Sequence, residues 1–337
     1  MNMQERKMFW DVLCSVDGRN PNADSLKLSE VIKYPKYLYR YRSVNPKSME
    51  ALKTNRLYFS CANYFDDPFD TFLHIDIESI YKEFLSAFQT EDSTAAVIEG
   101  IKEWFGEDFE EERNLSLTVR NLQNAATNEL GESFKHAALN IRYEVRKHTW
   151  AICFSENCLN EVLWLKYANN HKGFVLIYDL EEKKKWLSGC CSSGDMPSLE
   201  RGHTSLYPMY YSDVPYNATK FAKRVLIHLL EEQIGKNFPM HLDDSIISGI
   251  WEQERTTLIK KECHHYDEEW RMITTPMDNE VPVVEWMPSG IILGLCMSKK
   301  DEDITISFAR EAGIKNIYKA YIDNENRLNA YLANIVN

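Results

Sequence analysis

Two arginines, Arg40 and Arg42, are the first residues in the chain whose type and spacing indicate binding chemistry. Side chains alternate between the two faces of a strand, so both guanidiniums lie on one face if residues 37–42 form a strand. Two neighbouring guanidiniums can hold a phosphate or pyrophosphate through bidentate hydrogen bonds. A solvent-facing edge strand would show the same pattern, and both interpretations stay open at this point.

A second group of candidates follows a predicted core strand at residues 149–155. The hydroxyl of Ser155 can reach a ligand, and the ring of Tyr167 can stack on a nicotinamide or adenine ring. His171 can donate to a phosphate or act as an acid or base. The structural alternative is that Ser155 caps a helix, Tyr167 belongs to the core, and His171 ends that helix before Gly173.

Carboxylates dominate a third group, residues 266–271. As a strand, this segment places Asp267, Glu269 and Arg271 on one side, where we expect them to line an exposed cleft. A carboxylate in a cleft can stabilise a developing oxocarbenium ion or orient a sugar hydroxyl. A cross-strand ladder of ion pairs is the structural alternative.

An acidic turn supplies the fourth group, which contains Asp66, Asp67 and Asp70. Together with Glu269, these carboxylates could bind Mg²⁺ as a phosphoesterase requires. An Asp-Asp-Pro turn also forms without a metal, because Asp bonds to its own backbone there. We assign no metal ligands on this basis.

The elements that must position these groups predict an α+β fold with a mixed central sheet and helical insertions. We expect an N-terminal helix and loop over residues 1–30, with the loop at 17–24. A single α+β domain then covers 31–337, with helical insertions at about 76–148 and 216–262. Within the second insertion, helices are predicted at 217–235 and 243–261. Strands are predicted at 37–42, 57–60, 149–155, 173–178, 206–211, 268–274, 281–286, 290–296 and 316–321.

Composition narrows the class of protein. The 337 residues carry a formal net charge of −12, so the overall field does not favour nucleic acid or anionic lipid. No stretch approaches the roughly 20 apolar residues of a membrane helix, and the N-terminal apolar run is too short for a signal peptide. The eight cysteines are scattered and are interpreted as reduced thiols. We therefore expect a cytoplasmic protein without a membrane partner.

Four motifs, taken in order, resemble a bacterial family known only as a domain of unknown function. They are Tyr39–Ser43, Leu57–Asp70, Phe154–Gly173 and Glu269–Arg271. Their order also resembles that of ADP-ribosyltransferases of the Arg-Ser-Glu type, which implies an ADP-ribosyltransferase-like fold and NAD as co-substrate.

That second resemblance implies roles for individual residues. Glu269 would be catalytic, Arg40 or Arg42 would hold the NAD phosphates, and Ser155 would line the nicotinamide pocket. The remaining candidates for nucleotide binding are Ser60, Tyr167 and His171. No metal is part of this set.

The leading hypothesis is an enzyme that cleaves NAD and transfers ADP-ribose to a macromolecular acceptor, either a protein or a nucleic acid. By analogy, such an enzyme would act as a toxin or a phage-defence effector. Two alternatives are a non-catalytic nucleotide or ligand sensor and a Mg²⁺-dependent phosphoesterase using Asp67, Asp70 and Glu269. The sequence leaves open the acceptor, the oligomeric state and whether the protein is catalytically active.

Overall fold

The computed structural model describes residues 1–88, 135–181, 205–234, 251–275 and 281–333. The chain forms two compact units. The first, here called the sheet unit, contains residues 1–71, 146–215 and 253–337, and the second, the helical unit, contains 72–145 and 216–252. Parts of the predicted helical insertions, at 89–134 and 235–250, lie outside the described residues.

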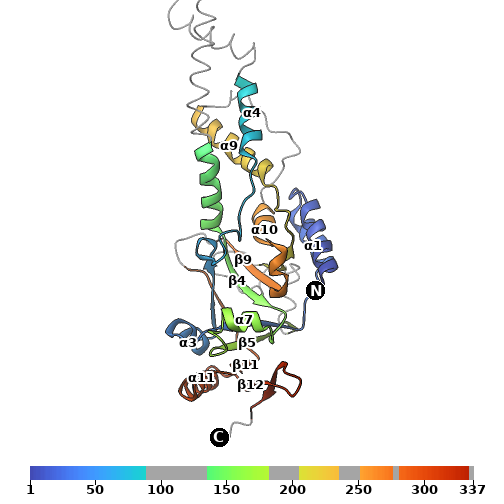
Figure 1. Cartoon of the computed structure of the whole chain (residues 1–337). Helices are drawn as coiled ribbons and strands as arrows, with labels where there is room; N and C mark the ends of the chain where they lie inside the picture. Colours follow the sequence, from blue (N-terminus) through green and yellow to red (C-terminus); the bar gives the residue numbers. More distant parts are fainter. Residues whose placement is uncertain (89–134, 182–204, 235–250, 276–280, 334–337) are drawn as a thin grey trace, which may run out of the picture. The chain divides into compact units, whose positions relative to one another are not determined.

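The sheet unit is built around a mixed sheet in which nine strands are described (Figure 1). The strand order is β13-β12-β11-β5-β1-β4-β9-β6, and β3 also pairs with β4. The predicted α+β class with a mixed central sheet is therefore confirmed. The strands are β1 Tyr37–Arg42, β3 Ser60–Cys61, β4 Trp150–Ser155, β5 Phe174–Asp179, β6 Ser205–Pro208, β9 Glu269–Thr274, β11 Gly290–Leu293, β12 Asn316–Ile322 and β13 Leu328–Leu332.

Two short strand pairs stand beside the main sheet. Strand β2 (Arg56–Tyr58) pairs with β10 (Val283–Glu285), and β7 (Tyr210–Tyr211) pairs with β8 (Ile259–Lys260). The predicted helix at 243–261 is wrong in its described C-terminal part, because α10 (Glu252–Thr257) ends before β8 begins. The partner strand β7 and the β-branched Ile259 favour the extended conformation there.

Asparagine caps explain where several helices begin. Asn20 accepts a hydrogen bond from the Ala23 N–H, and Pro21 supplies a preset φ at the first position of α2 (Pro21–Val31). Residues 21–24, the second half of the polar loop predicted at 17–24, belong to this helix. Asn45 caps α3 (Pro46–Lys53) in the same way, with Pro46 at the first position.

Helices pack against the sheet and against one another. On one face, α7 (Glu161–Lys166) buries Trp164 in a cluster with Tyr41 and Val175 of the sheet. At the β6 edge, Phe9 of α1 (Met3–Ser15) stacks on Tyr207, with ring centroids 5.7 Å apart. The helix α11 (Lys299–Glu311) lies beside α3 (Figure 1). This packing removes large apolar side chains from water and fixes the positions of β1, β4 and β9.

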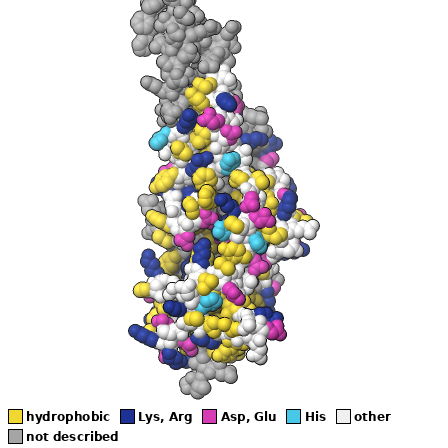
Figure 2. All heavy atoms as spheres, in the orientation of Figure 1, with side chains coloured by type: hydrophobic (Ala, Val, Ile, Leu, Met, Phe, Trp, Pro, Cys, Tyr) yellow, Lys and Arg dark blue, Asp and Glu magenta, His cyan; other side chains and the backbone are white. Residues whose placement is uncertain are grey.

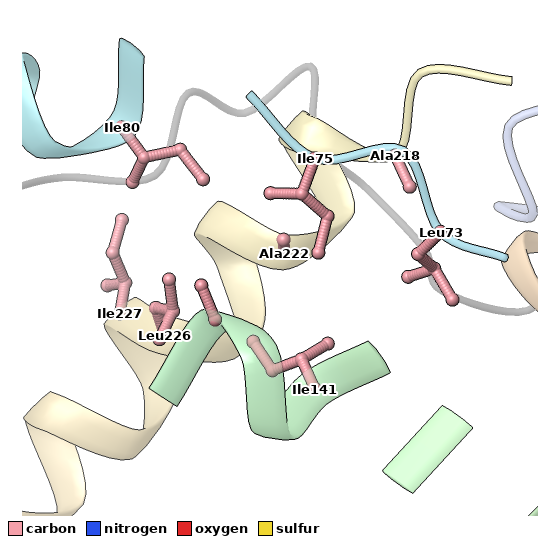
Figure 3. Packing of buried hydrophobic residues seen from close by; sticks show 9 residues of the cluster. Leu73, Ile75, Ile80, Ile141, Ala218, Ala222, Leu226 and Ile227 are labelled. Carbon is pink, nitrogen blue, oxygen red and sulfur yellow. The ribbon is translucent and has the colours of Figure 1, made fainter. Parts of the chain in front are cut away.

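The helical unit is held together by aliphatic side chains. Its described helices are α4 (Ile77–Phe88), residues 135–148 and α9 (Thr219–Ile234). Figure 3 shows Ile75, Ile141, Ala222 and Leu226 gathered in one apolar cluster. The unit therefore draws its core from two stretches that are far apart in the sequence.

The surface shows no dominant charge on the face that Figure 2 presents, where acidic, basic and apolar side chains of the described residues are interspersed. Within the described ranges, no helix combines the length and the apolar character needed to span a bilayer.

Candidate functional site

A cavity of about 230 Å³ opens into the sheet unit where β1, β4 and β9 lie next to one another. Most of the residues predicted to bind or react belong to its lining. These are Arg40, Arg42, Ser60, Ser155, Tyr167 and Glu269. The predicted residue His171 is not among the lining residues. The tertiary structure thus brings together side chains that are up to 229 positions apart in the sequence, from Arg40 to Glu269.

The cavity forms because the sheet splits between β1 and β4. Strand β4 pairs with β9 over its whole length, but it meets β1 at only one pair, Tyr39 opposite Ser155. Farther along the same edge, β4 pairs instead with β3, at Ala151 opposite Ser60. Residues 152–154 therefore have no strand partner on this edge among the described strands, and the cavity lies along this gap.

The split also explains how the arginines reach the carboxylates. Residues directly opposite each other in a sheet share a face, so Tyr39, Ser155 and Glu269 point the same way. Arg40 and Arg42 begin on the other face, because side chains alternate along β1. Only the gap between the strands lets one cavity touch side chains from both faces.

One wall of the cavity is a compensated cluster of buried charges around Arg271. Its Nη1 and Nη2 atoms donate to the two carboxylate oxygens of Asp70 at 2.7 and 2.5 Å. Its Nε atom donates to Oε1 of Glu269 at 2.7 Å. Arg271 is only 1% exposed and Glu269 5%, so the cleft expected to be exposed is a buried wall.

Lys260 completes this wall, although the sequence argument missed it. Its Nζ donates to Oε2 of Glu269 at 2.6 Å and to Oδ2 of Asp267 at 3.4 Å. The same ammonium lies 3.5 Å from Oδ2 of Asp70. A helix was predicted for this segment, and without knowing that β8 pairs with β7, no sequence signal places Lys260 among these carboxylates.

The cluster changes the protonation of its members. Burial alone would raise the pKa of Glu269, but the charges of Arg271 and Lys260 outweigh it and hold the pKa below its ordinary value. Burial would lower the pKa of Lys260, but Glu269 and Asp70 raise it well above normal. Asp267 differs from Glu269, because burial dominates there and raises its pKa. Glu269 is therefore an anion and Lys260 a cation at neutral pH.

The opposite wall carries buried charge without a counter-charge. Arg40 is 6% exposed, and its Nη2 donates to the carbonyl of Tyr58 at 3.3 Å. Among the described residues, neither Arg40 nor Arg42 has a carboxylate within ion-pair distance. Burial, and next the charge of Arg42, lower the pKa of Arg40 to about 9. Burial also lowers the pKa of Arg42.

The hydroxyl of Ser155 makes two hydrogen bonds to the backbone of neighbouring segments. Its Oγ donates to the carbonyl of Asp267 at 2.8 Å and accepts the N–H of Asn157 at 3.1 Å. The predicted helix cap is not Ser155 but Asn160, whose side chain accepts the N–H of Leu163. Ser155 thus joins the end of β4 to the carboxylate-bearing segment while one side of it faces the cavity.

Tyr167 stands at the mouth of the cavity rather than in the core. Its side chain is 39% exposed, and Nζ of Lys166 lies 5.0 Å from the ring centroid. Tyr64, which the sequence argument did not single out, also lines the cavity and is 83% exposed. Exposed aromatic rings of this kind can stack on a planar base.

His171 serves the fold and not the cavity. Its imidazole stacks on Trp164 with centroids 5.8 Å apart and an interplanar angle of 5°. Its backbone is left-handed, with φ at 61°, and its carbonyl accepts the N–H of Cys296. The predicted contact between His171 and a phosphate is therefore not supported by its position. The alternative that His171 ends the helix is also wrong, because α7 ends at Lys166 with Tyr167 as its C-cap and His171 lies in the turn that follows.

The acidic turn does not present a magnesium site. Both oxygens of Asp70 accept hydrogen bonds from Arg271, and both oxygens of Glu269 accept from Arg271 and Lys260. Asp67 instead lies 3.4 Å from Nε2 of His264. Protein cations already occupy the positions from which these carboxylates would ligate a metal, so this donor set does not fit Mg²⁺.

Comparisons of the chain with protein-family models, with curated proteins and with solved structures gave no match. What the cavity can bind therefore follows from its own residues.

Proposed function

We propose that this chain binds a nucleotide through its phosphates in the split-sheet cavity and is an NAD-cleaving, ADP-ribosyltransferase-like enzyme. The observation that carries the proposal is the pairing of two uncompensated arginines, Arg40 and Arg42, with an ionised carboxylate, Glu269, in one cavity. A ligand that matches both features carries phosphate at one end and develops positive charge at the other.

The arginines account for the phosphates. A buried charge without a partner is costly, and proteins rarely keep one unless a ligand supplies the counter-charge. Two guanidiniums two residues apart match the two negative charges of a pyrophosphate. Because Arg42 is closer to the surface than Arg40, an entering anion would meet Arg42 first.

Glu269 accounts for the reaction. When the bond between nicotinamide and ribose breaks, its electron pair leaves with the nicotinamide, and positive charge develops on the ribose carbon. A fixed carboxylate stabilises that charge. A carboxylate has about four acceptor positions, so Glu269 can still accept a ribose hydroxyl while Lys260 and Arg271 each occupy one.

The size of the cavity limits which part of NAD it encloses. At about 230 Å³ it is smaller than the roughly 300–1,000 Å³ of pockets that bury a drug-sized ligand. The nicotinamide riboside and its phosphate would lie inside, and the adenosine half would lie near the exposed rings of Tyr64 and Tyr167. An ADP-ribose acceptor would approach at the same mouth, in keeping with a toxin or phage-defence role.

The order of the residues along the chain supports the same proposal. The ADP-ribosyltransferase resemblance implies an Arg, then a Ser, then a Glu on separate strands. Here Arg40 and Arg42 lie on β1, Ser155 on β4 and Glu269 on β9, and these three strands are neighbours in the sheet.

NAD turnover by the purified protein tests the proposal. Nicotinamide release and labelling of lysate components by isotopically labelled NAD would be measured for the wild type and for Glu269→Gln. We expect release by the wild type and at least a roughly hundredfold loss in the variant, because one positioned charge is worth about 2.7–4 kcal/mol in a transition state. Glu285→Gln, an exposed residue on β10 outside the cavity, is the matched control and should retain full activity. Absence of release together with absence of NAD binding would refute the proposal.

A non-catalytic nucleotide sensor is the second candidate, and one observation favours it. Both carboxylate oxygens of Glu269 are already held by cations of the protein, as in a structural ion cluster. A sensor would bind NAD or ADP-ribose through Arg40 and Arg42 without releasing nicotinamide. Calorimetric binding that persists in the absence of turnover would favour this function over the enzyme.

A further inference from the structure

Lys260 occupies an unusual position among the carboxylates of the cavity. Its ammonium lies within ion-pair distance of three of them, at 2.6 Å from Glu269, 3.4 Å from Asp267 and 3.5 Å from Asp70. It is 8% exposed and comes from β8, outside the main sheet. The shortest of these three distances joins Lys260 to Glu269, the proposed reactive carboxylate, which points to a role for Lys260 in the reaction.

The two cations that hold Glu269 are not equivalent. Arg271 makes two hydrogen bonds to Asp70 and one to the carbonyl of Thr257, and only one of its four hydrogen bonds within the described residues goes to Glu269. Lys260 makes its shortest contact with Glu269 and only longer contacts with Asp70 and Asp267. Without Lys260, Asp70 would keep both bonds from Arg271, but Oε2 of Glu269 would lose its partner.

We propose that Lys260 is a positioning residue that fixes Glu269 as an ionised carboxylate directed into the cavity, an inference that rests on the proposed function. The ion pairs of Lys260 are with Glu269, Asp267 and Asp70, and in the described residues none joins it to Arg40 or Arg42, where we expect the phosphate. It acts through Glu269, by holding one carboxylate oxygen so that the other lone pairs face the ribose.

Removing Lys260 would take one positive charge away from Glu269 and would leave the hydrogen bonds between Arg271 and Asp70 in place. Arg271 also lowers the pKa of Glu269, while Asp70 and Asp267 bring like charge close to it. The thiol of Cys153 and the phenols of Tyr167 and Tyr211 face it from three further elements. All three are neutral at pH 7, because their pKa values lie above the ordinary values of a thiol and a phenol. The described titratable and charged groups around Glu269 come from seven places in the chain: Lys260 on β8, Arg271 on β9, Asp70 in the acidic turn, Asp267 at the end of the 3₁₀ helix 262–267, Cys153 on β4, Tyr167 after α7 and Tyr211 on β7. From an eighth place, α1, Arg6 donates through Nη1 to the backbone carbonyl of Glu269 at 2.8 Å.

Removal of Lys260 should shift the pH dependence of the reaction. Turnover requires ionised Glu269, so activity is lost as pH falls through its pKa. An opposite charge within about 4–6 Å lowers a carboxyl pKa by roughly 1–3 units. Lys260→Met should therefore raise the pKa of Glu269 and move the acid limb of the pH–rate profile to higher pH by a shift in that range. At pH 7 we expect kcat to fall roughly ten- to hundredfold through misplacement of the carboxylate, with little change in the KM for NAD.

Three variants separate positioning from general support of the fold. Lys260→Arg keeps the charge and should restore the acid limb to its wild-type position. Lys261→Met removes the neighbouring lysine, which stacks on Phe69 at 3.8 Å and does not contact Glu269, and should behave as wild type. A uniform loss of activity at every pH in Lys260→Met, with an unshifted acid limb, would overturn the inference.

A measurement without turnover keeps this inference separate from the proposed function. The side-chain carboxyl of Glu269 would be titrated by ¹³C NMR, with its signal assigned by its absence in Glu269→Gln. We expect it to stay ionised to lower pH in the wild type than in Lys260→Met. That shift without any NAD cleavage would refute the enzyme while the control of Glu269 by Lys260 stands. Equal titration in the two proteins would refute the role of Lys260 even if NAD is cleaved.

Discussion

The two walls of the cavity differ in whether their buried charges have counter-charges. On the β9 side, Arg271 and Lys260 are surrounded by carboxylates at 2.5–3.5 Å. On the β1 side, Arg40 is also hidden from water, but in the described part of the chain its one hydrogen-bond acceptor is a carbonyl oxygen at 3.3 Å. Both walls belong to the same sheet and face the same cavity.

Under the proposed function, the β9 wall builds the site and the arginines of β1 bind the ligand. In a buried ion pair with good geometry, each charge holds the other in place. Removing one partner leaves the other charge buried without compensation, which destabilises the folded state. An arginine without a partner contributes nothing comparable to the folded state, and its charge becomes favourable only when an anion arrives. We therefore expect mutations in the two walls to divide between stability and affinity.

Arg271→Met should have the largest effect on stability. The substitution leaves Asp70 buried without its two hydrogen bonds, and breaking a buried pair in this way costs about 3–5 kcal/mol. Urea unfolding would measure the loss. Arg327→Met is the matched control, because Arg327 is exposed and its ion pairs with Asp323 and Glu325 should be worth under about 1 kcal/mol. Equal losses in the two variants would show that the β9 wall is not a structural cluster.

Arg40→Met should reverse this pattern. We expect the free energy of unfolding to stay the same or to rise by about 1 kcal/mol, because an uncompensated charge leaves the interior. Affinity for pyrophosphate or ADP-ribose should fall roughly ten- to hundredfold, since a hydrogen bond to a charged group contributes about 1.5–3 kcal/mol. Calorimetry would measure affinity, with Arg56→Met on the exposed strand β2 as control. Destabilisation as large as that of Arg271→Met would mean that Arg40 supports the fold.

His171→Asn should have the smallest effect and should spare binding. Asn accepts the left-handed backbone of this position, so the substitution removes mainly the ring that stacks on Trp164. We expect a loss of about 0.5–1.5 kcal/mol in unfolding free energy and no change in affinity for ADP-ribose. A loss of affinity comparable to that of Arg40→Met would place the imidazole in the site after all.

Local patterns in the sequence were enough to predict the class of the fold and the strands that carry the site. The alternation in residues 37–42 predicts β1 with both of its bounds, and β4 and β9 differ from their predicted ranges by one residue at the start. The caps Asn45 and Pro46 predict α3. The last strand, β13, was missed, because its polar alternation around Asn329 resembles a loop.

Some features of the site could not be predicted because they depend on partners distant in the chain. Alternation alone puts Arg40 and Ser155 on opposite faces of a regular sheet, and only the separation of β1 from β4 joins them in one cavity. Lys260 was predicted to be helical, and its contacts with Glu269 depend on the pairing of β8 with β7.

What the sequence by itself determined is therefore the set of chemical groups and the local elements that carry them: paired arginines on one strand, a serine at the end of another and a glutamate at the start of a third. These depend on side-chain alternation and capping, which act over a few residues. Only the tertiary structure decided which charges are neutralised and which have no counter-charge among the described residues. Compensation depends on distances of a few ångströms between segments as far apart as Asp70 and Arg271, and no local pattern encodes those distances.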